Sequence, residues 1–379
     1  MKPNYTVTIH TPQELNHSSY IQTGLFELER VGMLKVKVQL YLKKNKGMLT
    51  VDEQGTITKS SRPYPKTSFY TLLDVSTGIK KTFATDLYDF AEHFSEAALK
   101  NCDFYFKRNF ETCFVSPIQE HTKIKIYKLG LAFGTHSKNR HESIKFFLGL
   151  FLSNFRHKVK GDRYFFRRIF KISKTLIKHW KFINTSRNIG RFENLEKNIS
   201  INSILFQTRC FLHENDDDVK QIHQQRYHII KLLRQHFPEK FLGGFVSSKI
   251  ALEKYGDALT NVPTDPEKYL DAMKKARIVI YTRGLANSPA WKMAEYLSQG
   301  KVIIAEPLTA ELPVPLYDGN ELLYFRNDQE LIEKILLVLA DNELADHLSK
   351  NARTYFENHV HPVQNTKRIL ELMLNKPLV

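Results

Sequence analysis

The segment from Arg277 to Glu306 contains residue types and spacings suited to binding a phosphorylated ligand. It predicts a buried β-branched strand, then a loop with Arg283 and Gly284. A helix is expected next, with Ser288 as its N-cap and Pro289 in its first turn. The N–H groups and the dipole at the start of a helix attract anions. The segment therefore predicts a diphosphate site at this loop.

Three residues of this segment are spaced to share one face of the predicted helix. Ser288, Lys292 and Glu295 stand at i, i+4 and i+7, which would align a hydroxyl, a cation and a carboxylate. An N-cap serine and ordinary surface charges on an amphipathic helix would produce the same pattern. Glu306 ends the next predicted strand, where it would either face the same crevice or be an edge carboxylate.

The string AEYLSQGKVIIAE, together with the strand and loop before it, resembles the C-terminal domain of GT-B glycosyltransferases. The similarity is to bacterial group-1-like and CgeB-like proteins and covers roughly residues 200 to 375 by pattern. It implies an α/β fold of the GT-B type, with two Rossmann-like domains and an interdomain cleft. It also implies that Glu295 holds both ribose hydroxyls of a nucleotide, since a carboxylate can accept two hydrogen bonds. Lys292 and the loop from Arg283 to Ser288 would then contact phosphates or sugar.

Two further arginines are candidates for the donor diphosphate. The families that the sequence resembles commonly place cations after the first strand of this domain and along the next helix, where they neutralise the leaving diphosphate. Arg209 and Arg226 occupy those places, although surface charges or salt bridges to the acidic residues nearby would also explain them. The run Asp216-Asp217-Asp218 stands at a helix start, where capping accounts for it. We therefore expect no metal and no cofactor, with a nucleotide-sugar as co-substrate.

The catalytic base is less well defined by the sequence. An inverting transferase needs a carboxylate or imidazole to take the acceptor proton, whereas a retaining one depends mostly on the leaving phosphate, and both remain open. His17, in the first strand-to-helix loop, and Asp74, after an apolar strand, are expected to face the interdomain cleft, unless they are loop or capping residues. Lys107 and Arg108 suit an anionic acceptor or a surface role.

The length of 379 residues favours two domains, because a single core rarely extends so far. The first half alternates strands and helices irregularly, with a helix expected at about Tyr88 to Lys100, and becomes helical and basic after Ser143. The second half shows regular βα units, typical of a parallel sheet covered on both faces. We place an acceptor-side domain at 1–198 and a nucleotide-sugar-binding domain at 199–379.

The net positive charge is confined to the first half. Residues 1–200 hold 34 Lys and Arg against 17 Asp and Glu, whereas residues 201–379 hold 22 against 23. Aromatic residues are interleaved with the cations between Arg163 and Phe182. Such a surface suits anionic lipid headgroups, lipid-linked phosphates or nucleic acid, or is a solvated helical face. We expect it to dock on an anionic membrane surface.

The remaining features narrow the class of protein. The longest apolar run, Phe146 to Leu152, is too short to span a bilayer, and three cysteines without paired spacing are typical of free thiols in the cytoplasm. No GxGxxG follows a strand and no Walker-type loop is present. The sequence thus predicts a cytoplasmic, peripheral glycosyltransferase. Its substrates would be a nucleotide-sugar donor and a glycan or lipid-linked acceptor of cell-surface polysaccharide synthesis. A basic nucleic-acid-binding protein and an inactive GT-B scaffold are the alternatives, but the former leaves the near-neutral second half without a role.

Overall fold

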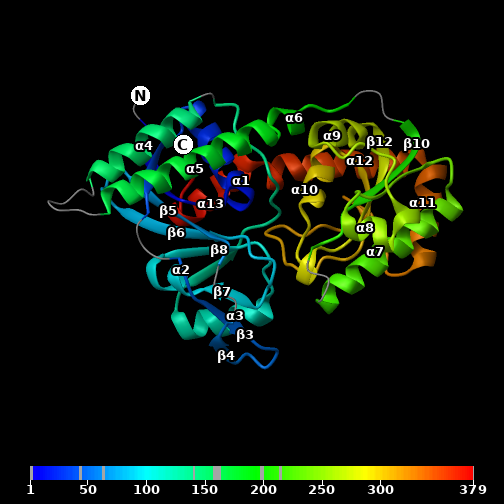
Figure 1. The fold of residues 1–379 in the computed structure, drawn as a ribbon, viewed down its shortest axis with the longest axis horizontal. Helices are drawn as coiled ribbons and strands as arrows, with labels where there is room; N and C mark the ends of the chain where they lie inside the picture. Colours follow the sequence, from blue (N-terminus) through cyan, green and yellow to red (C-terminus); the bar gives the residue numbers. More distant parts are fainter. Residues whose placement is uncertain are drawn as a thin grey trace. The chain divides into compact units, whose positions relative to one another are not determined.

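The computed structural model describes residues 3–41, 45–61, 65–139, 141–156, 164–196, 200–212 and 216–378. It divides the chain into two compact units, coloured by position in the chain in Figure 1. The first unit consists of residues 1–190, 311–313 and 361–379, and the second of residues 191–310 and 314–360. The boundary expected near residue 198 lies outside the described residues.

The first unit is built on a mixed six-stranded sheet in the order β2-β1-β5-β6-β8-β9. Its strands are β1 (Tyr5–Thr11), β2 (Lys35–Leu40), β5 (Thr67–Asp74), β6 (Lys80–Asp86), β8 (Phe104–Lys107) and β9 (Lys125–Lys128). A second, antiparallel sheet contains β3 (Met48–Val51), β4 (Ile57–Lys59) and β7 (His93–Ser95). The helices are α1 (Leu15–Arg30), α2 (Glu96–Asn101), α3 (Thr112–Thr122), α4 (Glu142–Arg156), α5 (Phe165–Thr185) and α13 (Pro362–Leu374).

Strand direction explains why the first half of the sequence alternates irregularly. All neighbouring strands in the large sheet are parallel except β5, which runs antiparallel to both β1 and β6. The helix expected over 88–100 is wrong in its first part, because β7 pairs with β3 there and α2 begins only at Glu96. Tertiary pairing has overridden local helical propensity at this place.

The last helix of the chain, α13, folds with the first unit, although residues 199–379 were expected to form the second domain. It packs along α1, and Asn365 donates to the carbonyl of Leu129 at 2.9 Å. Arg368 donates to the carbonyls of Lys128 and Leu129, both at 3.0 Å. These contacts satisfy carbonyls at the end of β9 and just after it, so the first unit needs this C-terminal helix to complete it.

The second unit is a regular doubly wound sheet, five parallel strands in the order β11-β10-β12-β13-β14. The strands are β10 (Ser200–Thr208), β11 (Phe241–Phe245), β12 (Ala276–Tyr281), β13 (Val302–Ala305) and β14 (Leu323–Tyr324). The longer helices are α7 (Asp217–His236), α9 (Pro266–Lys275), α10 (Trp291–Ser298), α11 (Asp328–Ala340) and α12 (Asn342–Tyr355). The short ones are α6 (Gly190–Glu193), α8 (Lys249–Lys254), η1 (Gly256–Ala258), η2 (Leu285–Asn287) and η3 (Phe356–Val360).

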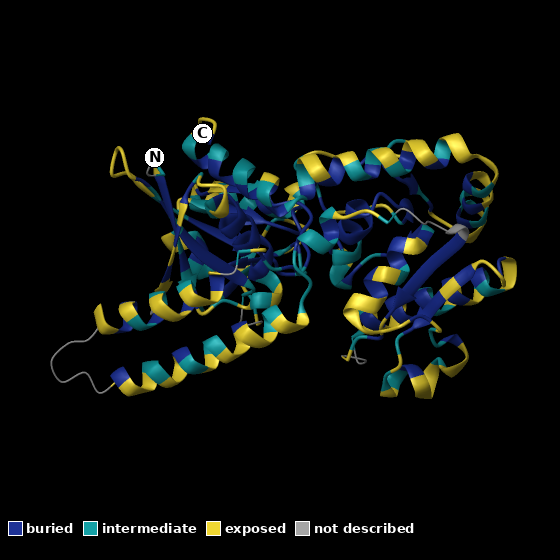
Figure 2. Cartoon of the chain, turned by 90° about the horizontal axis from the view of Figure 1, so that it is seen from above, coloured by how far each residue is buried: buried dark blue, intermediate teal, exposed yellow. Residues whose placement is uncertain are grey.

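Burial follows this architecture, and Figure 2 shows the two larger sheets mostly in the colour of buried residues, with partly exposed helices beside them. The β-branched residues Ile278, Val279 and Ile280 of β12 are at most 1% exposed, as a strand covered on both faces requires. The predicted α/β fold class with two Rossmann-like units is confirmed. Strand order reverses between β10 and β12, and doubly wound sheets bind ligands outside the carboxyl ends of their strands at such a point.

The acidic run before α7 caps the helix, as the sequence predicted. Asp216 is the N-cap residue, and its side chain accepts a hydrogen bond from the backbone N–H of Asp218 at 3.0 Å. Asp217 pairs with Lys220 at 2.8 Å. Within the described ranges, no helix is both long and apolar enough to cross a bilayer.

Candidate functional site in the second unit

The loops after β10, β12 and β13 are tied together at the carboxyl edge of the second sheet. Three of the predicted site residues form the ties: Arg226 reaches from α7, Arg283 follows β12 and Glu306 follows β13. These three residues are up to 80 positions apart in the sequence. In the structure they lie close together, beside the point where strand order reverses.

Arg226 is a buried cation that joins two loops. Its side chain donates to the carbonyl of Arg209 at 3.0 Å and to the carbonyl of Arg283 at 3.2 Å, and its guanidinium lies 5.1 Å from the centre of the Phe211 ring. Arg226 is only 5% exposed, and burial lowers the pKa of its guanidinium to about 10. Among the described residues no carboxylate forms an ion pair with it and no acceptor meets its Nε atom. A buried cation bonded only to carbonyls attracts an anion.

Glu306 fixes the loop after β12 through the main chain. Its Oε2 atom accepts a hydrogen bond from the backbone N–H of Arg283 at 2.8 Å, and its Oε1 atom accepts one from the side chain of Gln225. Burial raises the pKa of Glu306, against the opposing effects of these hydrogen bonds and of nearby arginines. Glu306 therefore has a structural role in shaping the loop, and sequence reasoning missed its partner Gln225.

The loop from Arg283 to Ser288 is closed on itself and anchored to α7. Asp218 accepts from the side chain of Arg283 and from the backbone N–H of Ala286, the latter at 2.8 Å. The backbone N–H of Gly284 donates to the carbonyl of Ser288 at 3.0 Å, and a Cβ atom on Gly284 would lie 2.7 Å from that oxygen, so only glycine fits there. Ala286 has φ of 50°, a left-handed conformation unusual for alanine.

The predicted start of the following helix is wrong. Ser288 is not the N-cap, because its N–H and C=O are used in the loop, and α10 begins at Trp291 with Ala290 at the N-cap. Ser288 is 3% exposed and lies outside the helix, so only Lys292 and Glu295 share a face of α10. The backbone N–H of Ala290 donates to the Tyr281 hydroxyl at 2.8 Å, which sets the entry to the helix.

Lys292 and Glu295 are positioned by α10 one turn apart. The Nζ atom of Lys292 donates to the carbonyl of Gln207 near the end of β10 and lies 4.8 Å from the centre of the Tyr269 ring. Glu295 is 6% exposed on the same helix. Arg209 differs from both, since its carbonyl accepts from Arg226 while its side chain is exposed. The second unit therefore presents cations at the ends of both β10 and β12.

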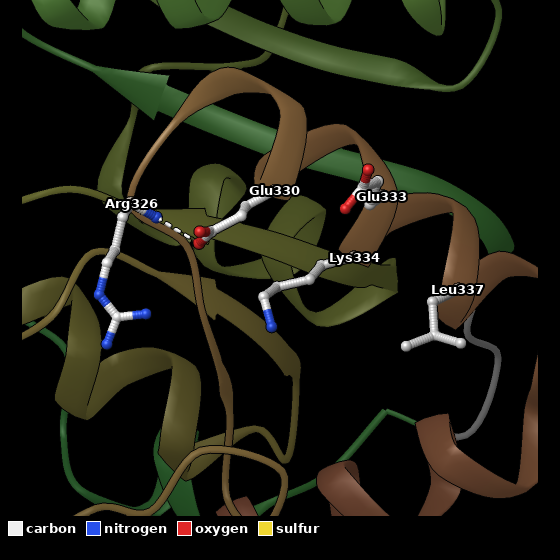
Figure 3. Close-up of a pocket in the computed structure, with 5 residues that line it drawn as sticks. All are labelled: Arg326, Glu330, Glu333, Lys334 and Leu337. Carbon is white, nitrogen blue, oxygen red and sulfur yellow. Dashed lines mark hydrogen bonds between the residues drawn. The ribbon is translucent and has the colours of Figure 1, made fainter.

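A hollow of about 540 Å³ lies elsewhere on the second unit. Figure 3 shows its lining residues, Arg326 after β14 and four side chains of α11. The backbone N–H of Arg326 donates to Glu330 at 2.9 Å. None of the residues predicted for the site lines this hollow, and β14 is the edge strand, so we do not assign the site there.

The first unit carries a charged cluster at the carboxyl ends of β6 and β8. Asp89 accepts from Lys66 and from Arg108, both at 2.6 Å. His17, near the start of α1, is influenced by all three charges. Burial lowers the pKa of His17 to about 4, and the charges of Lys66 and Arg108 add to this effect, so its imidazole is neutral at pH 7. Arg108 is thus committed to Asp89, which sequence reasoning did not identify.

Asp74 lies in the same sheet but at the opposite end of its strands. Because β5 runs antiparallel to β1, Asp74 pairs with Tyr5 at the start of β1, whereas His17 follows the end of β1. The two residues therefore lie at opposite ends of β1. Asp74 accepts from the backbone N–H of Ser76 at 3.0 Å and pairs with Lys376 at 3.4 Å, the pattern of a turn residue. Lys107, also a candidate for binding an anion, is fully buried with Asp86.

A family match covers most of the second unit. Residues 211–371 match the family model described as glycosyl transferase-like. No curated protein sequence matches the chain. In the part of the chain that the structure describes, no group of three or more His, Cys, Asp or Glu side chains is arranged to hold a metal ion.

Several solved structures are similar to this chain at low sequence identity and low TM-score. A putative UDP-N-acetylglucosamine 2-epimerase from Listeria monocytogenes is 11% identical, with a TM-score of 0.41, and the match covers 97% of this chain and 95% of that one. TarM is 14% identical, with a TM-score of 0.34 and coverage of 86% and 68%. WaaG, a glycosyltransferase involved in lipopolysaccharide biosynthesis, is 12% identical, with a TM-score of 0.34 and coverage of 70% and 62%. At the level of family, the chain is thus similar to glycosyl transferase-like proteins over residues 211–371.

Proposed function

We propose that the second unit binds a nucleoside-diphosphate sugar at the ends of β10 and β12, and that the protein transfers the sugar to an acceptor. The observation that carries this proposal is the buried guanidinium of Arg226, which joins the two loops at that place and has no carboxylate partner among the described residues. A diphosphate is the ligand chemistry that such a cation favours.

Each donor-binding residue has a role consistent with its position. Glu295 would hold the ribose hydroxyls, while Lys292 and the exposed side chain of Arg209 would contact the phosphates or the sugar. The loop from Arg283 to Ser288, Gly284 included, would wrap the diphosphate, with Glu306 holding its shape. A leaving nucleoside diphosphate gains negative charge in the transition state, and fixed cations stabilise it most when they need no reorganisation.

We also propose that transfer needs neither a metal ion nor a further cofactor. Asp216 is committed to the N-terminus of α7, and Asp218 to Arg283 and Ala286. The charge of the diphosphate would be met by Arg226 and Lys292 instead.

On the acceptor side, His17 is our candidate for the group that takes the proton of the acceptor hydroxyl. Its imidazole is neutral at pH 7 and so can accept a proton, and it lies with Lys66 and Arg108 at one edge of the first sheet. The acceptor would be a glycan or a lipid-linked sugar of cell-surface polysaccharide synthesis, reached from the cytoplasmic side of an anionic membrane.

Calorimetry with nucleoside diphosphates, followed by a transfer assay with the nucleotide-sugars that bind, tests the proposal. A true donor at 100 times its Kd should stabilise the protein by about 2.7 kcal/mol in a thermal-shift assay. Binding without release of nucleoside diphosphate in the presence of glycan or lipid-linked acceptors would favour an inactive scaffold. If no nucleotide binds and nucleic acid does, the glycosyltransferase proposal is wrong.

A further inference from the structure

The helix pair α4 and α5 of the first unit exposes an unusual number of large apolar side chains. Both helices lie side by side in contact, and Figure 2 shows them at the lower left with much of their outer surface exposed. In a protein that stays free in solution, an apolar surface of this extent is uncommon. The arrangement of these side chains on each helix indicates which kind of partner would cover them.

On α4 the exposed apolar residues form a single stripe. They stand at i, i+3, i+4, i+7, i+8 and i+11, namely Ile144, Phe147, Leu148, Phe151, Leu152 and Phe155. All but the half-buried Phe151 are 50 to 57% exposed. This spacing defines one face of a helix.

The opposite face of α4 is held tightly against β2. The backbone N–H of Leu40 donates to the Ser153 hydroxyl at 2.9 Å, and a Cβ atom on Gly149 would lie 2.4 Å from the carbonyl of Val38. Glycine is therefore required for this approach of helix to strand. The apolar stripe consequently lies on the side of α4 that faces away from the sheet.

On α5 an apolar stripe runs beside a basic one. Phe166, Phe170, Ile177 and Trp180, at i, i+4, i+11 and i+14, are 54 to 79% exposed. The basic stripe is displaced from the apolar one by one position along the helix. It consists of five exposed cations at i, i+4, i+7, i+11 and i+14, namely Arg167, Lys171, Lys174, Lys178 and Lys181. The Nζ atom of Lys174 lies 4.5 Å from the centre of the Phe170 ring, so the two stripes are in contact.

The third face of α5 is buried against the rest of the first unit. Phe165, Ile172 and His179 are buried along it, and the ring of His179 stacks on Phe146 of α4 at 4.1 Å between centroids. Neither helix offers an exposed acidic residue, because Glu142, the only one in either sequence, is 5% exposed. Helix packing thus accounts for one face of α5 and leaves the apolar and basic stripes without a structural role.

We infer that the stripes of α4 and α5 dock on an anionic lipid bilayer. Cations beside exposed aromatic and aliphatic side chains suit an interface where phosphates meet acyl chains. Nucleic acid would use the cations but not the aliphatic residues Ile144, Leu148 and Leu152. A second copy of the chain would bring the same five cations against each other with no exposed acid to pair them. Of the run between Arg163 and Phe182 that the sequence singled out, Arg163 itself lies outside the described residues.

This inference deepens the proposed function by naming the partner surface, and it rests on that function only for its biological purpose. Co-sedimentation of the full chain with phosphatidylcholine vesicles, with and without phosphatidylglycerol, measures docking in the absence of any donor. We expect binding to the anionic vesicles only. It should weaken when salt rises from about 0.1 M to 1 M, because the Debye length falls from about 10 Å to about 3 Å.

Two matched pairs of variants separate charge from apolar contact. Changing the five cations of the basic stripe to Gln should lower the vesicle partition coefficient by about tenfold or more. The control changes five exposed lysines elsewhere to Gln and should retain binding: Lys59, Lys80, Lys125, Lys268 and Lys275. Changing Phe166, Phe170, Ile177 and Trp180 to Ser should also reduce binding. The control is the double variant Leu252→Ser and Leu336→Ser, at exposed positions of the second unit, and it should bind vesicles as the wild type does.

Tryptophan emission provides a direct readout, because the chain has only Trp180 and Trp291. Anionic vesicles should shift the emission to shorter wavelength in the wild type and not in Trp180→Phe. If the wild type ignores anionic vesicles at low salt, if the lysine control loses as much binding as the stripe variant, or if the apolar variant binds normally, the inference is overturned. Nucleotide affinity measured on the same variants should stay unchanged, so failure here is distinguishable from failure of the donor site.

Discussion

The Nη1 atom of Arg226 donates a hydrogen bond to the carbonyl oxygen of Arg209 at 3.0 Å, so a helix holds the loop that follows the first strand of the second unit. A second hydrogen bond from the same guanidinium, to the carbonyl of Arg283, holds the loop after β12. The positive charge of Arg226 is thereby fixed between the two loops, where the diphosphate is proposed to bind.

Replacing Arg226 by Met should weaken nucleoside-diphosphate binding about tenfold or more, because a charge-assisted contact from a buried guanidinium is lost. Arg234→Met is the matched control. Arg234 lies on the same helix and also donates to carbonyls, at 2.6 Å for that of Leu259, but away from β12. Calorimetry on both variants checks this, and equal losses would mean that Arg226 acts only through the stability of α7.

Glu295→Ala should weaken binding of a nucleoside diphosphate at least about tenfold, because hydrogen bonds to a carboxylate contribute about 1.5–3 kcal/mol. The affinity for inorganic pyrophosphate, which lacks a ribose, should be unchanged in the same variant. Glu333→Gln, on the exposed part of α11, serves as control. A variant that binds both ligands as the wild type does would remove Glu295 from the site.

Turnover should survive excess EDTA. Asp216 and Asp218 already accept hydrogen bonds within the protein, and the charge of the diphosphate is assigned to Arg226 and Lys292. Initial rates with and without EDTA, then with added magnesium or manganese, give the answer. Activity lost to EDTA and restored by a metal would contradict this assignment.

His17→Gln should lower kcat about a hundredfold or more while leaving nucleotide affinity intact, the usual loss when a general base is removed. Because the pKa of His17 is lowered to about 4, the wild-type rate should fall as pH drops through about 4 and not near 6.5. Asp74→Asn, at the opposite edge of the sheet, should have normal activity. Full activity in His17→Gln would show that it takes no proton.

Glu142 and His179 predict a pH dependence of stability. The two side chains are buried with 3.7 Å between Oε1 and Nε2, and burial raises the pKa of Glu142 to about 8 and lowers that of His179 to about 4. Protonated Glu142 makes its full contribution to the free energy of unfolding below its ordinary pKa. This contribution is lost as pH rises from there through about 8. Stability from neutral His179 is lost as pH falls from about 6.5 to 4.

Of these two groups only Glu142 acts between pH 6.5 and 8, so the free energy of unfolding of the wild type should fall there by at most about 2 kcal/mol relative to that of Glu142→Gln. Burial lowers the pKa of Lys301 to about 7, which raises stability with pH in both proteins, so the difference between them isolates Glu142. Chemical denaturation of both proteins across this range measures the effect. Glu120→Gln, at an exposed position, should follow the wild type. The same pH dependence in the wild type and in Glu142→Gln would show that Glu142 contributes nothing to it.

The sequence by itself determined the features that depend on local pattern. The alternation of buried strands and amphipathic helices in the second half predicted a parallel sheet, and the run from Asp216 predicted a helix start that the structure confirms. The spacing of cations and aromatic residues along α5 was also readable, since a helix converts sequence spacing directly into faces.

The tertiary structure decided what depends on pairing between distant residues. The direction of β5 comes from its pairing with β1, and it separates Asp74 from His17 by the length of a strand. Whether Ser288 caps a helix depended on a loop closed by Gly284 and Asp218, and the partners of Arg226 are carbonyls 17 and 57 residues away. Such contacts are set by how the strands and helices pack, because hydrogen bonds to a main-chain carbonyl leave no mark in the residue types of the sequence.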